Sequence, residues 1–123
     1  MRLIIALSIA LTATSVQSLA QKNKLREAKN LMGQTPPDAN SAKTAIDAAI
    51  GDETTKNSAE TWFVRGQVYT ALKCPSCFET AYQCFQKAEE LDLRNEYKID
   101  IETKQLPMLS REAFNYGVER YQA

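Results

Sequence analysis

The residues best suited to chemistry are two cysteines two positions apart, in Cys74-Pro75-Ser76-Cys77. Such a pair can close a local disulfide, cycle between dithiol and disulfide, hold a metal, or remain as two thiols. Cys77 is expected at the start of a helix, where the helix dipole favours a thiolate. Redox enzymes with this spacing usually carry it after a strand of a mixed α/β fold, and no strand precedes it here. We therefore expect a disulfide, with free thiols and a redox or metal role as the alternatives.

Elsewhere the chain offers little catalytic chemistry. It contains no histidine, which removes the commonest general base and every histidine-ligated metal site. Cys84, about 10 Å from Cys77 along a helix axis, is too far for a disulfide within the helix and is expected as a small buried side chain. Three cysteines fall short of the four ligands of a structural zinc site. The sequence predicts no enzyme, no metal and no cofactor.

The charges of the chain balance, with 15 basic and 15 acidic residues. Nucleic-acid binding needs a clustered basic face, so this balance gives no case for a nucleic-acid partner. Carboxylates such as Glu89 and Glu90 are dispersed among lysines and arginines, a pattern typical of solvated helix faces. A catalytic pair of carboxylates is not expected.

The first twenty residues have the pattern of a secretory signal. Arg2 precedes an apolar run over residues 3–13, and Ser18 and Ala20 place small residues where a signal peptidase reads. A run of about 11 residues is too short to span a bilayer, which needs roughly 20. We expect a signal peptide over residues 1–20, cleaved after Ala20, with an uncleaved anchor or a buried amphipathic helix as the alternatives. The product is then exported, periplasmic or secreted from a Gram-negative bacterium, without a membrane span.

Hydrophobic periodicity over residues 21–123 predicts a single all-α domain of about five helices. Gly33 and Gly51 are placed as helix stops, Asp38 as a helix cap, and Pro107 as the site of a kink or a restart near Leu106. Ser76 and Glu79 have the spacing of a capping box, which predicts a helix start at Cys77. The expected helices cover residues 22–33, 38–51, 58–72, 77–92 and 95–122.

The third and fourth expected helices share a spaced set of residues that can pack one helix on the other. Gly66 lets two helix backbones approach, and small side chains do the same from the opposite helix. The set comprises Trp62, Gly66 and Tyr69 on the first helix and Ala81, Phe85 and Ala88 on the second. With this set, residues 60–93 resemble one tetratricopeptide repeat, an antiparallel helix-turn-helix unit of about 34 residues.

The sequence departs from that family in three places. Arg65 stands where the family usually has leucine, the turn with Cys74 and Cys77 is enlarged, and Leu93 replaces a closing proline. A degenerate unit precedes the best-matched repeat. An incomplete unit follows it around Ala113, so the last helix serves as a cap or the chain is a truncated form of a longer array. The incomplete unit leaves self-association open, because repeat proteins bury each unit against its neighbours.

The resemblance implies that the first helix of each pair lines a concave groove that binds a protein or peptide. In the best-matched repeat the implied groove residues are Glu60, Phe63, Val64, Gln67, Thr70 and Ala71, and in the last unit Arg111 and Asn115. For Phe63 and Val64, core packing is the alternative. The basic, asparagine-rich clamp of the chaperone-binding members is missing, which argues against a C-terminal carboxylate ligand.

The sequence thus favours a non-catalytic protein-interaction module outside the cytoplasm, with an unidentified protein or peptide partner. Two alternatives stay open. One is a small exported thiol-disulfide protein that uses Cys74 and Cys77. The other is a structural end piece of an envelope assembly.

Overall fold

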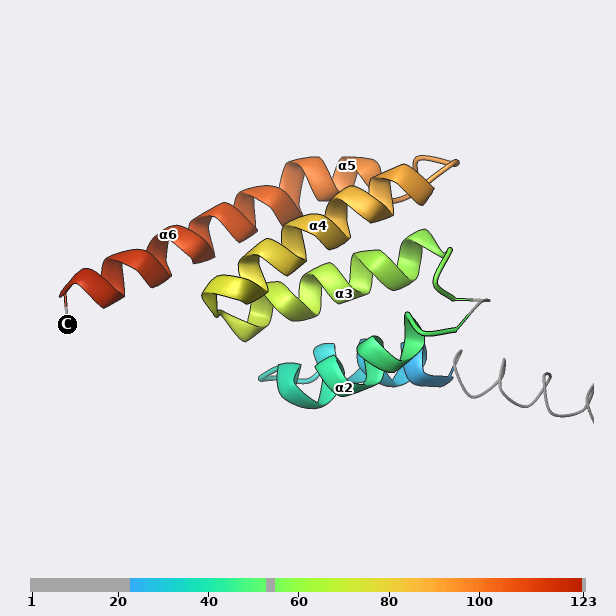
Figure 1. The fold of residues 1–123 in the computed structure, drawn as a ribbon, viewed down its shortest axis with the longest axis horizontal. Coiled ribbons are helices and arrows are strands. Elements are labelled where there is room, and N and C mark those ends of the chain that lie inside the picture. Colours follow the sequence, from blue (N-terminus) through green and yellow to red (C-terminus); the bar gives the residue numbers. More distant parts are fainter. Residues whose placement is uncertain (1–22, 53–54, 123) are drawn as a thin grey trace, which may run out of the picture.

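The structure is a computed structural model that describes residues 23–52 and 55–122, without the side chains of residues 118 and 120–122. The expected signal peptide over residues 1–20 and its cleavage after Ala20 lie outside the described residues. Within the described residues every regular element is helical, which confirms the all-α prediction (Figure 1). None of these helices is both long enough and apolar enough to cross a membrane.

The chain forms a helix over residues 23–32, followed by α2 (Ala39–Ala49), α3 (Ala59–Leu72), α4 (Pro75–Leu91) and a last helical run. That run joins α5 (Lys98–Asp100), the π-helical segment η1 (Ile101–Gln105) and α6 (Leu106–Gln122) without a break. Asp38 caps α2 as predicted, since its carboxylate accepts a hydrogen bond from the backbone N–H of Ser41 at 3.1 Å.

The start of α4 differs from the prediction. The helix begins at Pro75, two residues before the expected start at Cys77. Cys74 is its N-cap, and the Cys74 Sγ atom accepts a hydrogen bond from the backbone N–H of Cys77 at 3.2 Å. Pro75 fits the first helical position because its fixed φ suits a helix and its missing N–H has no helical partner there. The Ser76–Glu79 capping box was therefore the wrong signal.

The last helical run starts later than expected and widens before Pro107. The Asp92 carboxylate accepts hydrogen bonds from the backbone N–H groups of Glu96, Tyr97 and Lys98 at 2.8–3.1 Å, so the run begins at Lys98 rather than near Asn95. Pro107 cannot donate a backbone hydrogen bond and crowds the preceding turn. The preceding turn is π-helical, and α6 begins at Leu106, where the restart was expected.

Helices α3 and α4 form an antiparallel hairpin, joined by Lys73 and Cys74, and they share the most extensive interface of the molecule (Figure 1). Gly66 makes this approach possible, because a Cβ atom at that position would lie 2.5 Å from Cε1 of Phe85. Ala81, Phe85 and Ala88 of α4 are buried against α3, and Tyr69 of α3 is buried as well, whereas Trp62 is only half-buried.

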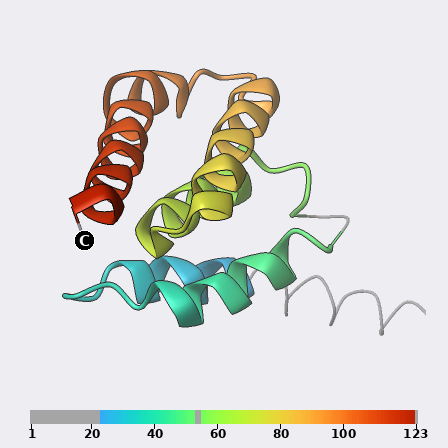
Figure 2. The same cartoon turned by 60° about the vertical axis from the view of Figure 1, so that its left-hand side comes forward.

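Two hydrophobic clusters hold the helices together. The first joins residues 23–32, α2 and α3 through alanines, Ile46, Val64 and Val68. The second joins α3, α4 and the last helical run, and it centres on Phe85, Ile101 and Leu109. In Figure 2 the α3–α4 hairpin rises from the first helix pair, and α6 descends beside it. Helix α3 contributes to both clusters and is the central helix of the fold.

Candidate functional site

A groove lies along one side of α3, between the end of the first helix and the last helical run, with a cavity volume of about 740 Å³. All six α3 residues that the sequence assigned to a groove line it: Glu60, Phe63, Val64, Gln67, Thr70 and Ala71. The opposite walls come from Lys29, Met32, Gly33, Pro37, Lys73, Tyr97, Gln105, Met108 and Glu112. We call this set the α3 groove. Its volume suits a few side chains of a bound chain rather than a single ion.

Aromatic and methionine side chains form the apolar part of the α3 groove. The ring of Phe63 lies 4.9 Å from that of Tyr97 and 6.2 Å from that of Phe85, measured between centroids. Phe63 therefore both lines the groove and packs against the core, so groove exposure and core packing are both correct for this residue. Met32 and Met108 flank it from the walls. Methionine side chains adapt their shape at little cost, which suits a surface that accepts apolar side chains.

An ion pair lies at each end of the groove floor. Lys29 pairs with Glu60 at the start of α3, and Lys73 Nζ lies 3.3 Å from Glu112 Oε2 at its end. Thirteen positions separate Glu60 from Lys73, which is about 20 Å at 1.5 Å per residue. Such a length matches about six residues of extended chain. The ends can therefore pair with either sign of charge, while the middle selects apolar side chains.

Some polar side chains of the groove form hydrogen bonds within the protein, and others do not. Thr70 Oγ1 donates to the backbone oxygen of Gly66 at 2.8 Å, and Gln105 Nε2 donates to Asp100 at 2.9 Å. Within the described residues, no hydrogen bond is formed by the side chain of the half-buried Gln67. Burial and then the negative charges of Glu60, Glu96 and Asp92 raise the pKa of Tyr97, so its hydroxyl is protonated at neutral pH.

The last helical run faces the groove with other residues than the sequence indicated. Arg111 and Asn115 are exposed and do not line the groove. Gln105, Met108 and Glu112 do so instead. Their spacing of three and four residues marks one helix face. Leu106 and Leu109 pack into the second hydrophobic cluster with residues of α4, and this packing turns Gln105, Met108 and Glu112 toward the groove.

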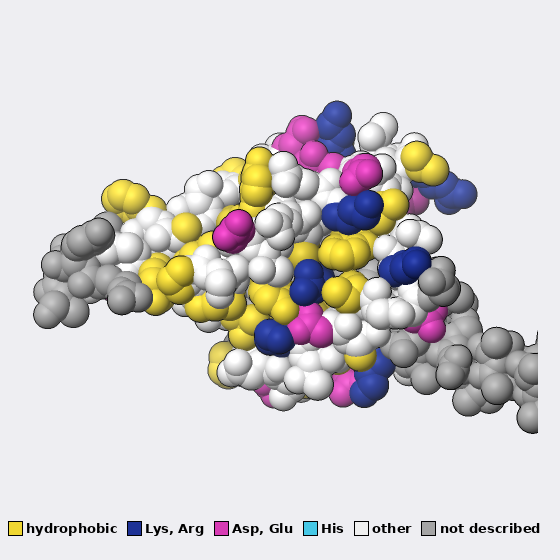
Figure 3. Space-filling model, viewed as in Figure 1, with side chains coloured by type: hydrophobic (Ala, Val, Ile, Leu, Met, Phe, Trp, Pro, Cys, Tyr) yellow, Lys and Arg dark blue, Asp and Glu magenta, His cyan; other side chains and the backbone are white. Residues whose placement is uncertain are grey.

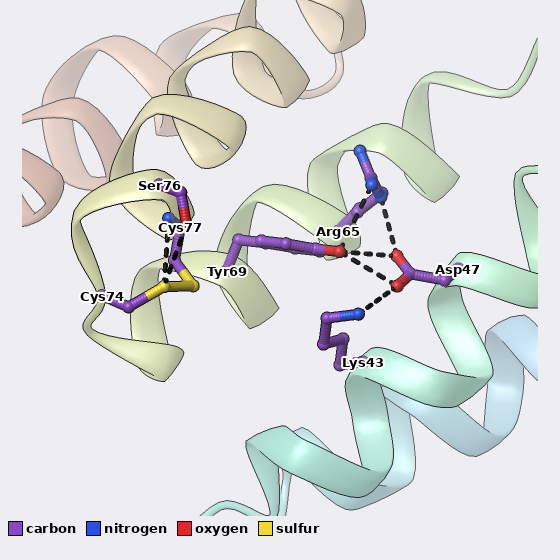
Figure 4. Close-up of a disulfide and its surroundings, with 7 residues drawn as sticks. All are labelled: Lys43, Asp47, Arg65, Tyr69, Cys74, Ser76 and Cys77. Carbon is purple, nitrogen blue, oxygen red and sulfur yellow. Dashed lines mark hydrogen bonds and ion pairs between the residues drawn. A yellow bond between two sulfur atoms is a disulfide. The ribbon is translucent and has the colours of Figure 1, made fainter.

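A polar network explains the arginine that departs from the family pattern. Arg65 Nε donates to the Asp47 carboxylate of α2 at 3.1 Å, and the Tyr69 hydroxyl donates to the same carboxylate at 3.0 Å (Figure 4). Lys43 pairs with Asp47 at 2.8 Å, and the guanidinium of Arg65 lies 4.6 Å from the ring centroid of Tyr69. A leucine at this position would leave Asp47 with fewer partners. The network ties α2 to α3 on a different side from the groove.

The surroundings of Asp47 and Cys84 shift the pKa values of both groups away from neutral pH. Burial opposes the ionisation of Asp47, but hydrogen bonds from Lys43, Arg65 and Tyr69 outweigh it and lower the pKa of Asp47. Cys84 is buried beside Arg65, whose Nη1 lies 3.2 Å from its sulfur. Burial raises the pKa of Cys84 despite that arginine, so Cys84 is a protonated thiol at neutral pH. The hydrogen bonds to Asp47 tie α2 to α3.

Cys74 and Cys77 are joined by a disulfide in the first turn of α4 (Figure 4). Within the described residues, no group of three or more acidic, cysteine or histidine side chains could hold a metal ion. On the face shown in Figure 3, basic and acidic side chains are mixed rather than gathered into patches of one sign. No family model matches the chain, and neither does any curated protein or solved structure at a significant level.

Proposed function

We propose that the protein is a non-catalytic interaction module that binds a peptide segment of another protein in the α3 groove. The observation that carries the proposal is that the six α3 residues implied by the repeat resemblance all line the wall of one cavity. The groove runs along a single helix, α3. Because α3 packs against both α2 and α4, its groove residues are already ordered before a peptide binds. Binding therefore costs little conformational entropy in the protein itself.

The chemistry of the groove indicates the kind of ligand. Phe63, Tyr97 and Met108 supply apolar contact area, and Gln67 offers an amide to the backbone of a bound peptide. The ion pairs at the two ends are accessible to charged residues that flank an apolar centre. A short segment with two or three apolar side chains between polar residues fits this arrangement.

Export is part of the proposal. Disulfides persist in oxidising compartments such as the periplasm, and they are rare in the cytosol. The disulfide in α4 and the signal-like first twenty residues therefore support a site of action outside the cytoplasm. We also propose that α3 and α4 form a tetratricopeptide-like repeat. The close Gly66–Phe85 contact and the antiparallel hairpin of these two helices support this proposal.

The test is a selection of binding peptides on the full chain, followed by two matched variants. Gln67→Arg places a long cation in the groove, whereas Gln83→Arg makes the same change at an exposed position of α4. We expect selected peptides to lose at least tenfold in affinity for Gln67→Arg and to bind Gln83→Arg like the unchanged protein. Equal binding to both variants would refute the groove as the site.

A further inference from the structure

The disulfide lies outside the α3 groove, and its position gives it little to do as a crosslink. It joins residues only three positions apart, in a turn whose backbone is already set by the first turn of α4. A disulfide restricts the unfolded chain less when the closed loop is short. Both cysteines are half-buried, and the contact between Cys74 Sγ and the Ser76 hydroxyl lies at the exposed surface.

The two sulfur atoms have different surroundings. Cys77 packs against the second hydrophobic cluster, whereas Cys74 belongs to neither cluster and precedes the helix as its N-cap. An incoming thiolate must approach along the line of the S–S bond. An incoming thiolate therefore reaches Cys74 more easily than Cys77. Cys74 is the sulfur that is attacked, and Cys77 is the leaving group.

The start of α4 stabilises negative charge on Cys74. The helix is 17 residues long, and its N-terminal end carries the positive end of the helix dipole. The backbone N–H of Cys77 donates to Cys74 Sγ at 3.2 Å, and the Ser76 hydroxyl lies 3.6 Å from the same sulfur (Figure 4). Donors that point at a sulfur lower the cost of the thiolate, which is the reactive form.

We propose that Cys74 and Cys77 form a thiol–disulfide exchange site for cysteine-containing peptides or proteins, with Cys74 as the exchanging sulfur and Cys77 as the resolving one. A substrate thiolate attacks Cys74, and a bond to the substrate sulfur forms as the Cys74–Cys77 bond breaks. The electron pair leaves on Cys77, which takes a proton from water. The second thiolate of the substrate then displaces Cys74, so two electrons pass from the substrate dithiol to the cysteine pair.

The same steps run in reverse when the reduced pair meets a substrate disulfide. Cys74 attacks first, and Cys77 then resolves the mixed disulfide and restores the internal bond. Cys84 takes no part, because its side chain is only 1% exposed and lies behind Arg65. The proposal does not rest on peptide binding in the α3 groove, so each can fail without the other.

The first experiment compares the two sulfurs, with oxidised glutathione as the probe. Both proteins carry Cys84→Ser, and one adds Cys77→Ser while the other adds Cys74→Ser. Intact-mass spectrometry follows formation of the mixed disulfide at neutral pH. We expect the protein that retains Cys74 to react at least tenfold faster than the one that retains Cys77. Equal rates, or the opposite order, would overturn the assignment.

A second experiment separates an exchange site from a buried crosslink. The Cys84→Ser protein with both other cysteines is reduced by dithiothreitol in increasing low concentrations of urea, while circular dichroism reports the helices. An exchange site is reduced and reoxidised while the protein stays folded, so its rate barely changes with urea below the unfolding transition. A rate that rises in proportion to the unfolded fraction contradicts the proposal.

Discussion

Two sides of α3 use similar residue types for opposite purposes. On the α4 side, Gly66 brings the helices so close that an added Cβ would lie 2.5 Å from Phe85. On the groove side, Phe63 and Gln67 face a cavity of about 740 Å³. Phe85 of α4 and Phe63 of α3 supply an aromatic ring to the two sides, and their centroids lie 6.2 Å apart. The element packed across from an apolar helix face therefore decides whether that face is core or binding surface.

Removal of the two aromatic rings should change the stability of the protein by different amounts. Phe85→Ala should lower the free energy of unfolding by about 4 kcal/mol, because Phe85 is fully buried and its loss leaves a cavity. Phe63→Ala should cost roughly half of that, because Phe63 is half-buried and its site opens to water. Urea unfolding of both variants measures the difference. Equal losses would mean that the groove side is part of the core.

The next effect concerns the side of α3 that faces α2. Asp47→Asn should lower the free energy of unfolding by about 2 kcal/mol at pH 7, because it weakens charge-assisted hydrogen bonds from Lys43 and Arg65. The pKa of Asp47 is lowered in the folded protein, so its contribution is present above the ordinary pKa of 3.8 and is lost as pH falls through the folded value.

The unchanged protein and Asp47→Asn should therefore converge in stability as the medium is acidified below pH of about 4. Thermal unfolding across a pH series measures this. Glu102→Gln, at an exposed position of η1, is the matched control and should leave the pH profile unchanged. A stability gap for Asp47→Asn that persists undiminished in strong acid argues against the ionised network.

A smaller effect tests the close approach on the α4 side. Gly66→Ala should destabilise the protein by about 1 kcal/mol. The steric clash with Phe85 should cost about 2 kcal/mol, and the higher helix propensity of alanine should return about 1 kcal/mol of this. Combining it with Phe85→Leu should recover part of the loss in a double-mutant cycle. Simple additivity of the two changes would show that the contact is not tight.

A substitution in the α6 wall of the groove should have a modest effect on peptide affinity. Met108→Ala removes a side chain from the groove wall and should weaken a selected peptide about fivefold, which is about 1 kcal/mol. Phe114→Ala removes an exposed ring from the same helix without touching the groove and should leave affinity unchanged. Calorimetric titration of both variants measures this. A loss on Phe114→Ala alone would move the binding surface to the outer face of α6.

Local sequence patterns predicted most of the helices, whereas the groove side of α3 was predicted from the resemblance to the repeat family. Helical periodicity and caps such as Asp38 are local, and a hairpin with a glycine opposite Phe85 has few ways to pack. Those features depend on residues close in sequence. Helix α3 (Ala59–Leu72) was therefore readable to within one residue of its start.

The other walls of the groove and the role of Arg65 depend on contacts between helices far apart in the chain. The groove contributions of Met32 and Tyr97 depend on helices far apart in the chain, and the rotation of α6 is set by Leu106 and Leu109 against the second cluster. Arg65 read as a departure from a family, yet it is required where α2 places Asp47 within 3.1 Å. Short-range rules cannot supply such distances, because packing between helices sums many weak contacts that no local pattern encodes.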